Sequence, residues 1–196
     1  MKKKHNVSPQ IPTLNQVREE LYRERYKKKY RKVLRSTVYT LIVVAAVSVL
    51  VATLWMPVLQ IYGTSMQPTL KEGEIVISVK GSDFETGDLV AFYLGNKLLI
   101  KRCIAGPGDW VDITEEGDIY VNGELLIEPY IEEKSFGECN LELPYQVPDN
   151  KWFLVGDHRA TSTDSRHTAV GCVAEEQIVG KIVYRVWPFD EFGLLS

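Results

Sequence analysis

The sequence predicts a mainly β protein: one antiparallel β domain preceded by an N-terminal transmembrane helix. Three observations favour this fold class. No charged residue occurs between Arg35 and Lys71, and residues 38–56 are nearly all apolar. After that stretch, short apolar runs alternate with Gly-Asp, Asn-Gly and Pro turns, a pattern typical of antiparallel sheets. Charge is also divided along the chain, and its 196 residues leave room for one folded domain and an appendage.

The first segment, residues 1–35, is a predicted basic tail. It carries twelve Lys and Arg against three Glu, a net charge of +9, whereas residues 36–196 carry eleven basic and 23 acidic residues, a net charge of −12. The run RERYKKKYRK at residues 23–32 directly precedes the apolar stretch. Such a run favours contact with anionic lipid headgroups, at about 1 kcal/mol per basic residue. The lipid bilayer is therefore a predicted partner, and we expect no nucleic acid partner.

The second segment, residues 36–57, is the predicted transmembrane helix. The sequence VYTLIVVAAVSVLVATLWM at residues 38–56 is close to the ~20 residues that span a bilayer. The alternatives are a buried helix of a soluble domain and a cleaved signal sequence, although the apolar run exceeds the usual ~7–15 residues of the latter. Because the basic flank precedes the span, the positive-inside rule predicts a cytoplasmic N-terminus and an extracytoplasmic domain at residues 58–196.

The third segment is the predicted β domain. Its strand-like runs are residues 74–80, 88–94, 98–105, 110–113, 119–122, 151–156 and 181–187. Asn122-Gly123 predicts a tight hairpin, since both residues tolerate the positive φ angles of a primed turn. Residues 114–150 are rich in Glu, Gly and Pro and are predicted to form a peripheral insertion.

The three cysteines, Cys103, Cys139 and Cys172, include no C-x-x-C pair. We therefore expect no metal site. An oxidising exterior permits a disulfide between Cys139 and Cys172, and separate thiols are an equal alternative that the sequence leaves open.

Ser65 lies in the loop GTSMQPT at residues 63–69, nine positions after Met56. Even a fully extended chain keeps it within about 30 Å of the predicted membrane boundary, at ~3.3 Å per residue. A serine in a Gly/Pro loop is normally a turn residue, and it is also a candidate nucleophile.

Lys101 lies in the run LLIKRCIAGPGD at residues 98–109, which reads as a strand entering a turn. Period-two alternation puts Lys101 on the same face as Leu99 and Cys103, with Arg102 on the other face. Burial among apolar neighbours lowers a lysine pKa and yields a neutral amine that can take a proton from a serine hydroxyl. The alternative is a strand lysine whose amine reaches solvent.

The loop GDHRATSTDSR at residues 156–166 is the third candidate segment. The Ser162 hydroxyl could hydrogen-bond a neutral lysine and orient it, while Asp164 and Arg166 are expected to form a structural ion pair. His158 or His167 near Asp164 could instead supply a Ser-His-Asp triad. Neither histidine has the strand setting of Lys101, so we favour a loop hydrogen-bonding role for His158.

Together, the apolar span and the three motifs in this order resemble type I signal peptidases over about residues 38–188. The resemblance implies a membrane-bound β catalytic domain that cleaves signal peptides from exported preproteins without a cofactor. It implies Ser65 as nucleophile, Lys101 as general base and Ser162 as the residue that orients Lys101. The residues implied to support the scaffold are Arg102, Asp157, Asp164 and Arg166. The protein-export translocon is a further partner that the resemblance suggests.

The oxyanion hole is expected to use backbone N–H groups of Gly63 and Ser65. Some family members have a serine two positions before the nucleophile, where this chain has Gly63, so the number of donors stays open. Two other functions also stay open: a self-cleaving repressor-type Ser/Lys protease, and a membrane-tethered β module without enzymatic activity.

Overall fold

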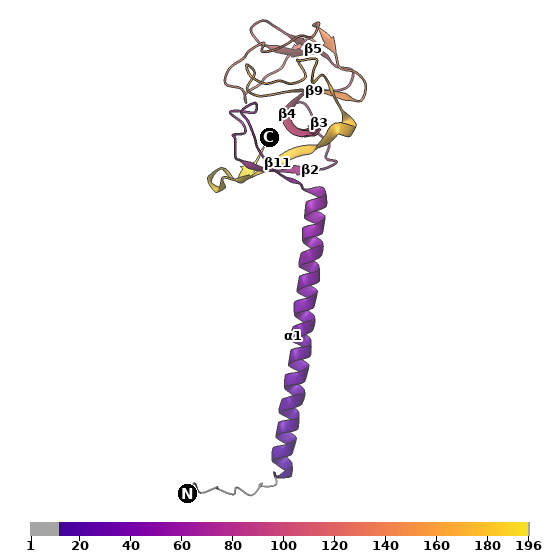
Figure 1. Ribbon diagram of the computed structural model, residues 1–196, viewed down its shortest axis with the longest axis vertical. Helices are drawn as coiled ribbons and strands as arrows, with labels where there is room; N and C mark the ends of the chain where they lie inside the picture. Colours follow the sequence, from indigo (N-terminus) through magenta and orange to yellow (C-terminus); the bar gives the residue numbers. More distant parts are fainter. Residues whose placement is uncertain (1–11, 196) are drawn as a thin grey trace, which may run out of the picture. The chain divides into compact units, whose positions relative to one another are not determined.

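The computed structural model describes residues 12–195 (Figure 1). The first part of the predicted basic tail, with Lys2, Lys3, Lys4 and His5, lies outside the described residues. The chain divides into a helical unit that ends at Leu50 and a β unit that begins at Val51.

Helix α1 spans Leu14–Trp55, 42 residues without a glycine or proline. Pro12 precedes it and Pro57 follows it, as expected for residues that interrupt helical hydrogen bonding. The helix begins inside the segment predicted as a tail and ends close to the predicted boundary at residue 57. It contains an 18-residue window of mean hydropathy 2.3 and is long and apolar enough to cross a membrane. At 1.5 Å per residue it measures about 63 Å, so its basic part can extend beyond a hydrocarbon core of about 30 Å.

The β unit contains twelve strands in the described part of the chain. They are β1 (Val58–Gln60), β2 (Ile75–Val79), β3 (Leu89–Leu94), β4 (Lys97–Ala105), β5 (Trp110–Ile113), β6 (Ile119–Val121), β7 (Glu124–Leu125), β8 (Tyr145–Gln146), β9 (Lys151–Val155), β10 (Val173–Ala174), β11 (Ile178–Trp187) and β12 (Gly193–Leu194). Two short 3-10 helices, η1 (Glu175–Gln177) and η2 (Phe189–Glu191), flank β11. Each of the seven predicted runs forms a strand, and the predicted fold class is confirmed.

The main sheet has the strand order β1-β2-β11-β3-β4-β9-β10, with β12 paired to β11, and all its pairings are antiparallel. Strand β11 lies between β2 and β3 and shifts register against both. Gly180 lies at one of these shifts with φ +155°, where a Cβ would lie 2.1 Å from the carbonyl oxygen of Val79. Only glycine therefore fits this close approach of the two strands.

The second sheet has the order β7-β6-β5-β8. Its hairpin turns at Asn122 (φ 53°) and Gly123 (φ 83°), which confirms the predicted primed turn. Strands β6, β7 and β8 belong to the segment predicted as a peripheral insertion. In Figure 1, β5 marks this sheet, and β9 and β4 of the main sheet lie beside it.

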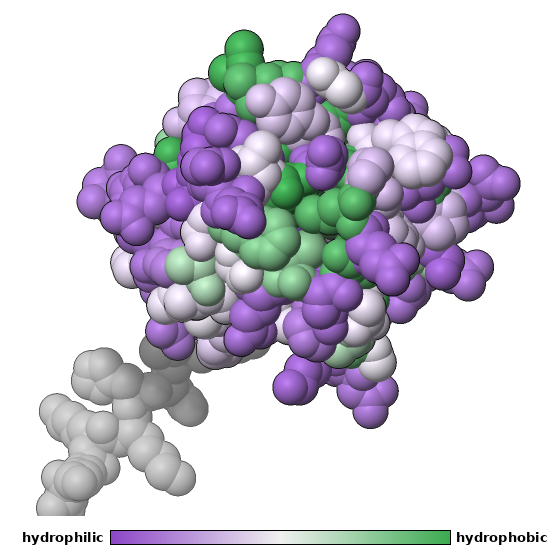
Figure 2. Space-filling model, turned by 90° about the horizontal axis from the view of Figure 1, so that it is seen from above, coloured by the Kyte–Doolittle hydropathy of each residue, from purple (hydrophilic) through white to green (hydrophobic). Residues whose placement is uncertain are grey.

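Three apolar clusters form the core of the β unit. The first joins the two sheets, because Val111 and Ile119 of the second sheet pack with Ile104, Phe153 and Val155 of the main sheet. Figure 2 looks onto the side of the β unit that carries the second sheet, and most of that surface is hydrophilic around a small central hydrophobic area. The second sheet therefore covers apolar residues on one side and faces solvent on the other.

Candidate active site

The loop that carries Ser65 connects β1 to β2. Its neighbours Met66 and Leu70 are buried in an apolar cluster with Val76, Leu89 and Ile182. The Leu70 N–H donates to the Met66 carbonyl at 2.8 Å. Ser65 itself is half-buried. Ile61, before the serine, is buried in the same cluster, so apolar side chains anchor the loop on both sides of Ser65.

Lys101 lies in the middle of β4, opposite Val90 of β3. Leu99 and Cys103 belong to one apolar cluster and Ile100 to another, as the predicted alternation requires. Only 3% of the Lys101 surface is exposed. Burial lowers the Lys101 pKa to about 8; the nearby charges of Asp164 and Asp157 raise it, and that of Arg166 lowers it. A substantial fraction of the amine is therefore neutral near physiological pH.

Ser162 is the hydrogen-bonding partner of this amine. The Lys101 Nζ donates to Ser162 Oγ at 2.9 Å, and both side chains are buried. The loop that carries Ser162 is fixed by Asp164, whose carboxylate accepts from Arg166 Nε at 2.9 Å and from the Gly156 N–H at 2.9 Å. Burial opposes ionisation of Asp164, but the hydrogen bonds and charge of Arg166 outweigh it and lower the Asp164 pKa. The predicted ion pair of Asp164 and Arg166 is present.

Gly156 brings the two serines together. A Cβ at this position would lie 2.1 Å from Ser162 Oγ and 2.6 Å from the Ser65 carbonyl oxygen, so these atoms are close neighbours. The His158 N–H donates to the same Ser65 carbonyl at 3.1 Å. The structure therefore brings the segments of Ser65, Lys101 and Ser162 to one place.

Arg102 and Asp157 form a buried ion pair beside this site. Arg102 donates to both carboxylate oxygens of Asp157, at 2.9 and 2.7 Å, and Thr69 Oγ1 donates to Asp157 as well. Breaking such a buried pair by removing one partner costs about 3–5 kcal/mol. These contacts tie β4, the Ser65 loop and the Ser162 loop to one another.

The sequence did not indicate a second group of buried contacts. Arg159 forms an ion pair with Glu128, with Nη1 donating to Oε2 at 2.9 Å, and both side chains are almost wholly buried. Tyr130 donates to Glu128 and places its ring 3.7 Å from the Arg102 guanidinium, at cation–π distance. Glu128 and Tyr130 come from the predicted insertion, far from the motifs in the sequence, so no local pattern could have found them.

The two described histidines make other contacts. His158 Nδ1 lies 2.8 Å from Thr161 Oγ1, and His167 Nδ1 accepts from the Ala169 N–H. Within residues 12–195, neither ring is hydrogen-bonded to Ser65 or to Asp164. In the described part of the chain, the two histidines therefore do not form a hydrogen-bonded Ser-His-Asp arrangement.

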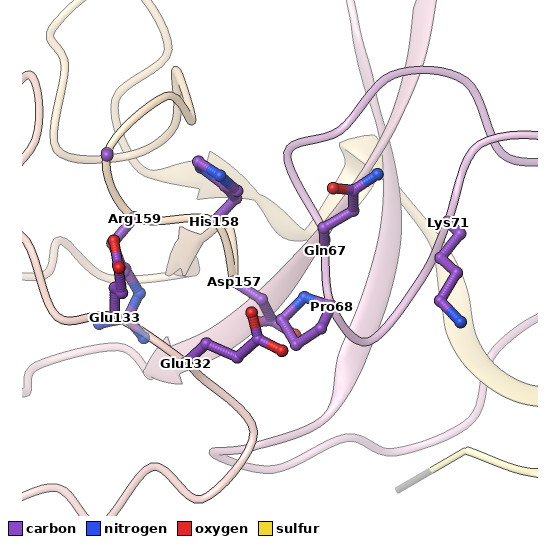
Figure 3. A pocket seen from close by; sticks show the side chains of 9 residues that line it. Gln67, Pro68, Lys71, Glu132, Glu133, Asp157, His158 and Arg159 are labelled. Carbon is purple, nitrogen blue, oxygen red and sulfur yellow. The ribbon is translucent and has the colours of Figure 1, made fainter.

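Two cavities adjoin the Ser65 loop. The first is an apolar groove of about 390 Å³, lined by Ser65 and Met66 together with residues 58–63 and 98–100. The second is a polar cavity of about 290 Å³ that begins at Gln67 and Pro68 and includes His158 (Figure 3). A half-buried serine between a groove and a polar cavity is accessible to an extended polypeptide.

Two backbone donors near the serine are unused. Within the described residues, the N–H groups of Gly63 and Ser65 have no hydrogen-bond acceptor. Gly63 has φ +83°, a left-handed conformation that favours glycine. Both N–H groups are thus available to a substrate oxygen.

The three cysteines, all among the described residues, form no disulfide bond. All three are free thiols, and burial raises the pKa of Cys103 to about 12. The described part of the chain also contains no group of His, Cys, Asp or Glu arranged to hold a metal ion.

The fold and the family comparison define a hydrolase of the serine protease class. The sequence model of the family described as signal peptidase, peptidase S26, matches residues 33–187, and the chain belongs to this family.

Two signal peptidases are similar to about two thirds of the chain. Signal peptidase IB of Staphylococcus aureus is 37% identical in an alignment of 153 residues, and the match covers 67% of this chain and 78% of that protein. Signal peptidase I of Bacillus amyloliquefaciens is 36% identical in an alignment of 140 residues, and the match covers 66% of this chain and 75% of that protein. The solved structure of signal peptidase I from Enterococcus faecalis has a TM-score of 0.42 and 24% identity, and the match covers 51% of this chain and 97% of that one.

A Gly156→Ala substitution tests the close approach at the site. The added methyl group would displace Ser162 Oγ and the Ser65 carbonyl. Since misplacement by about 1 Å can cost a hundredfold in rate, we expect kcat/KM for a preprotein to fall by about a hundredfold or more. Gly193→Ala is the matched control, because nothing lies within 4 Å of its Cβ position. Full activity of Gly156→Ala would show that this contact does not position the serines.

Proposed function

We propose that this protein removes signal peptides from exported preproteins, with Ser65 as the nucleophile and Lys101 as the general base. The observation that carries the proposal is the buried Lys101 amine at 2.9 Å from Ser162 Oγ, in a segment adjoining Ser65. Family membership supports the reaction, and the geometry supports the assignment of residues.

In the first half of the reaction, neutral Lys101 takes the proton of Ser65 Oγ while that oxygen attacks the carbonyl carbon at the cut. Ser162 holds the amine in place by accepting its hydrogen bond. The negative charge on the substrate oxygen is stabilised by the N–H groups of Ser65 and Gly63. Protonated Lys101 then gives its proton to the departing amine, the peptide bond breaks, and the leader stays bound to Ser65 as an ester.

In the second half, a water molecule replaces the departed amine. Lys101, neutral again, takes one proton from this water molecule while the water oxygen attacks the ester carbon. Collapse of this intermediate breaks the ester bond, and Lys101 returns the proton to Ser65 Oγ. The net change is addition of one water molecule across the peptide bond.

The apolar groove is the proposed binding site for the end of the leader. Strand β1 is an edge strand, and residues 98–100 of β4 pair with β3 but not with β9, so both offer a backbone edge against which an extended peptide can add as a strand. Side chains that point into a groove so close to the backbone must be small, which suits residues such as Ala one and three positions before the cut.

Helix α1 is the proposed membrane anchor. It crosses the bilayer once, with the basic segment before residue 36 in the cytoplasm and the β unit outside. The lipid bilayer is thus a partner, and the protein-export translocon is a further proposed partner.

The two other functions differ in what they require. A self-cleaving repressor-type protease would not require a membrane anchor. A β module without enzymatic activity would not require a buried lysine beside a serine, because burying an amine with no carboxylate partner costs free energy.

Substitution of the site residues tests the catalytic assignment. Ser65→Ala and Lys101→Ala are expected to abolish cleavage of a preprotein by the detergent-solubilised protein, since each removes a group that reacts. Ser162→Ala should slow cleavage, and His158→Ala should change it much less. The amounts of the two cleavage products on gels give the rates. Thermal unfolding shows whether each variant is folded. An active Lys101→Ala variant, or a folded but inactive His158→Ala variant, would contradict the lysine base.

The lowered pKa of Lys101 predicts how activity depends on pH. At a pKa of about 8, about one molecule in ten holds the free base at pH 7, against about one in a few thousand for a solvated lysine. We expect kcat/KM to rise with pH along a limb with an apparent pKa near 8. The limb should persist when His158 and His167 are both replaced by Gln. Its loss in that double variant would contradict the assignment.

The lowered pKa of Lys101 also makes the stability of the fold depend on pH. The unfolded chain holds the Lys101 proton up to a higher pH than the folded chain does, so burial of the ammonium opposes folding. This cost is fully present below about pH 8 and is lost as the pH rises toward 10.5.

Protease accessibility tests the proposed orientation. With one epitope tag at each end of the chain, protease added outside spheroplasts should remove the C-terminal tag and spare the N-terminal tag, because only the β unit lies outside. Detergent-lysed spheroplasts, in which both tags should be lost, are the control. The opposite pattern of protection would overturn the orientation.

A further inference from the structure

The polar cavity beside the Ser65 loop has no role in the mechanism above. We infer that it binds the first residues of the mature protein, those that follow the cut, and that it favours basic over acidic side chains there. This inference rests on the proposed function, because it assumes that Ser65 is the point of cleavage.

The position of the cavity follows from its lining. The apolar groove is lined by Ser65 and Met66, and the polar cavity by the next two residues, Gln67 and Pro68. The two cavities share no lining residue. The His158 N–H, which bonds the Ser65 carbonyl, belongs to a residue that also lines the polar cavity. The polar cavity thus begins two residues after Ser65 and is linked to it through His158, and there we place the substrate residues that follow the cut.

The distances suit a short stretch of polypeptide. Gln67 is two residues from Ser65, so their Cα atoms are at most about 7 Å apart. An extended substrate covers that distance in about two residues, at ~3.3 Å each. Side chains at the second and third positions after the cut therefore reach the cavity.

The charge of the cavity comes from two glutamates. Three other charged residues of its lining are paired: Lys71 with Glu191, Asp157 with Arg102, and Arg159 with Glu128. Glu132 and Glu133 form no hydrogen bond or ion pair within residues 12–195, and both are exposed. Figure 3 shows the Glu132 carboxylate pointing toward Pro68. The lining thus carries two uncompensated negative charges.

The segment that presents these glutamates is held firmly on both sides. Before them, Glu128 is paired with Arg159, and the Tyr130 ring lies over Arg102. After them, Arg166 Nη1 donates to the carbonyl of Phe136 at 3.0 Å. The segment 128–136, which contributes Glu132 and Glu133 to the cavity lining, is therefore anchored at both ends by the same arginines that support the candidate site. The Glu132 and Glu133 carboxylates are thus held on a positioned segment of the backbone beside the substrate.

The test uses the full-length protein in detergent and one preprotein in three versions. The versions are identical up to the cut and carry Lys, Gln or Glu at both the second and third positions after it. We expect kcat/KM to fall from the Lys to the Gln to the Glu version, by about three- to tenfold across the series, because two partly exposed charges interact weakly. Added salt should reduce the ratio, since exposed charges are screened.

Three variants identify the source of the preference. The double substitution Glu132→Gln and Glu133→Gln should bring the Lys-to-Glu ratio close to one, and Glu132→Lys with Glu133→Lys should invert it. The matched control is Glu115→Gln with Glu116→Gln, an exposed glutamate pair in the turn between β5 and β6, which should keep the wild-type ratio.

The outcomes separate this inference from the proposed function. Cleavage of all three versions at equal rates, or a ratio that persists in the Glu132 and Glu133 variants, overturns the charged cavity and leaves the function standing. Absence of cleavage, or cleavage that survives Ser65→Ala, overturns the proposed function and this inference with it.

Discussion

The Lys101 amine is almost wholly removed from water, and no carboxylate forms an ion pair with it in the described part of the chain. An ordinary buried lysine would be paired with a carboxylate, which would keep it charged. Here Asp164, whose charge raises the Lys101 pKa, is instead paired with Arg166, whose charge lowers it. Ser162 is left as the direct partner. Burial thus lowers the Lys101 pKa to about 8, and the hydrogen bond to Ser162 holds the amine in place.

The Lys101 pKa depends on where the surrounding charged side chains lie. Three buried arginines hold these side chains in place. Arg102, Arg159 and Arg166 each have a carboxylate partner. Arg102 also contacts the Tyr130 ring, Arg166 donates to the Phe136 carbonyl, and Arg159 donates to the Gly156 carbonyl of its own loop. Buried ion pairs of this kind add little net stability, because desolvation offsets their attraction. They instead restrict geometry, because the planar guanidinium can donate hydrogen bonds to its partners only over a narrow range of positions. The relative positions of the Ser65, Lys101 and Ser162 segments follow from them.

Local sequence patterns were sufficient for the features that depend on near neighbours. The alternation in residues 98–105 predicted the faces of β4, and Asn122-Gly123 predicted a turn whose two φ angles are positive. Helix α1 ends at Trp55, close to the predicted end of the transmembrane segment, and begins at Leu14, inside the segment predicted as a basic tail, because Lys and Arg are good helix formers. The Glu128–Arg159 pair and the contact at Gly156 could not be predicted. Both join segments that only the folded sheets bring together.

The distance between the anchor and the serine is limited by the chain itself. The carbonyls of Trp55 and Pro57, at the end of α1, accept hydrogen bonds from Lys80 and Ser78 at the end of β2. Only nine residues separate Trp55 from Ser65, and three of them form β1 against β2, so the serine cannot move far from the helix end. A signal peptide is itself an apolar segment that leaves the bilayer at its cleavage end. With α1 as the proposed anchor and Ser65 as the proposed nucleophile, the enzyme can meet that end without drawing the leader out of the lipid, which avoids exposing apolar side chains to water.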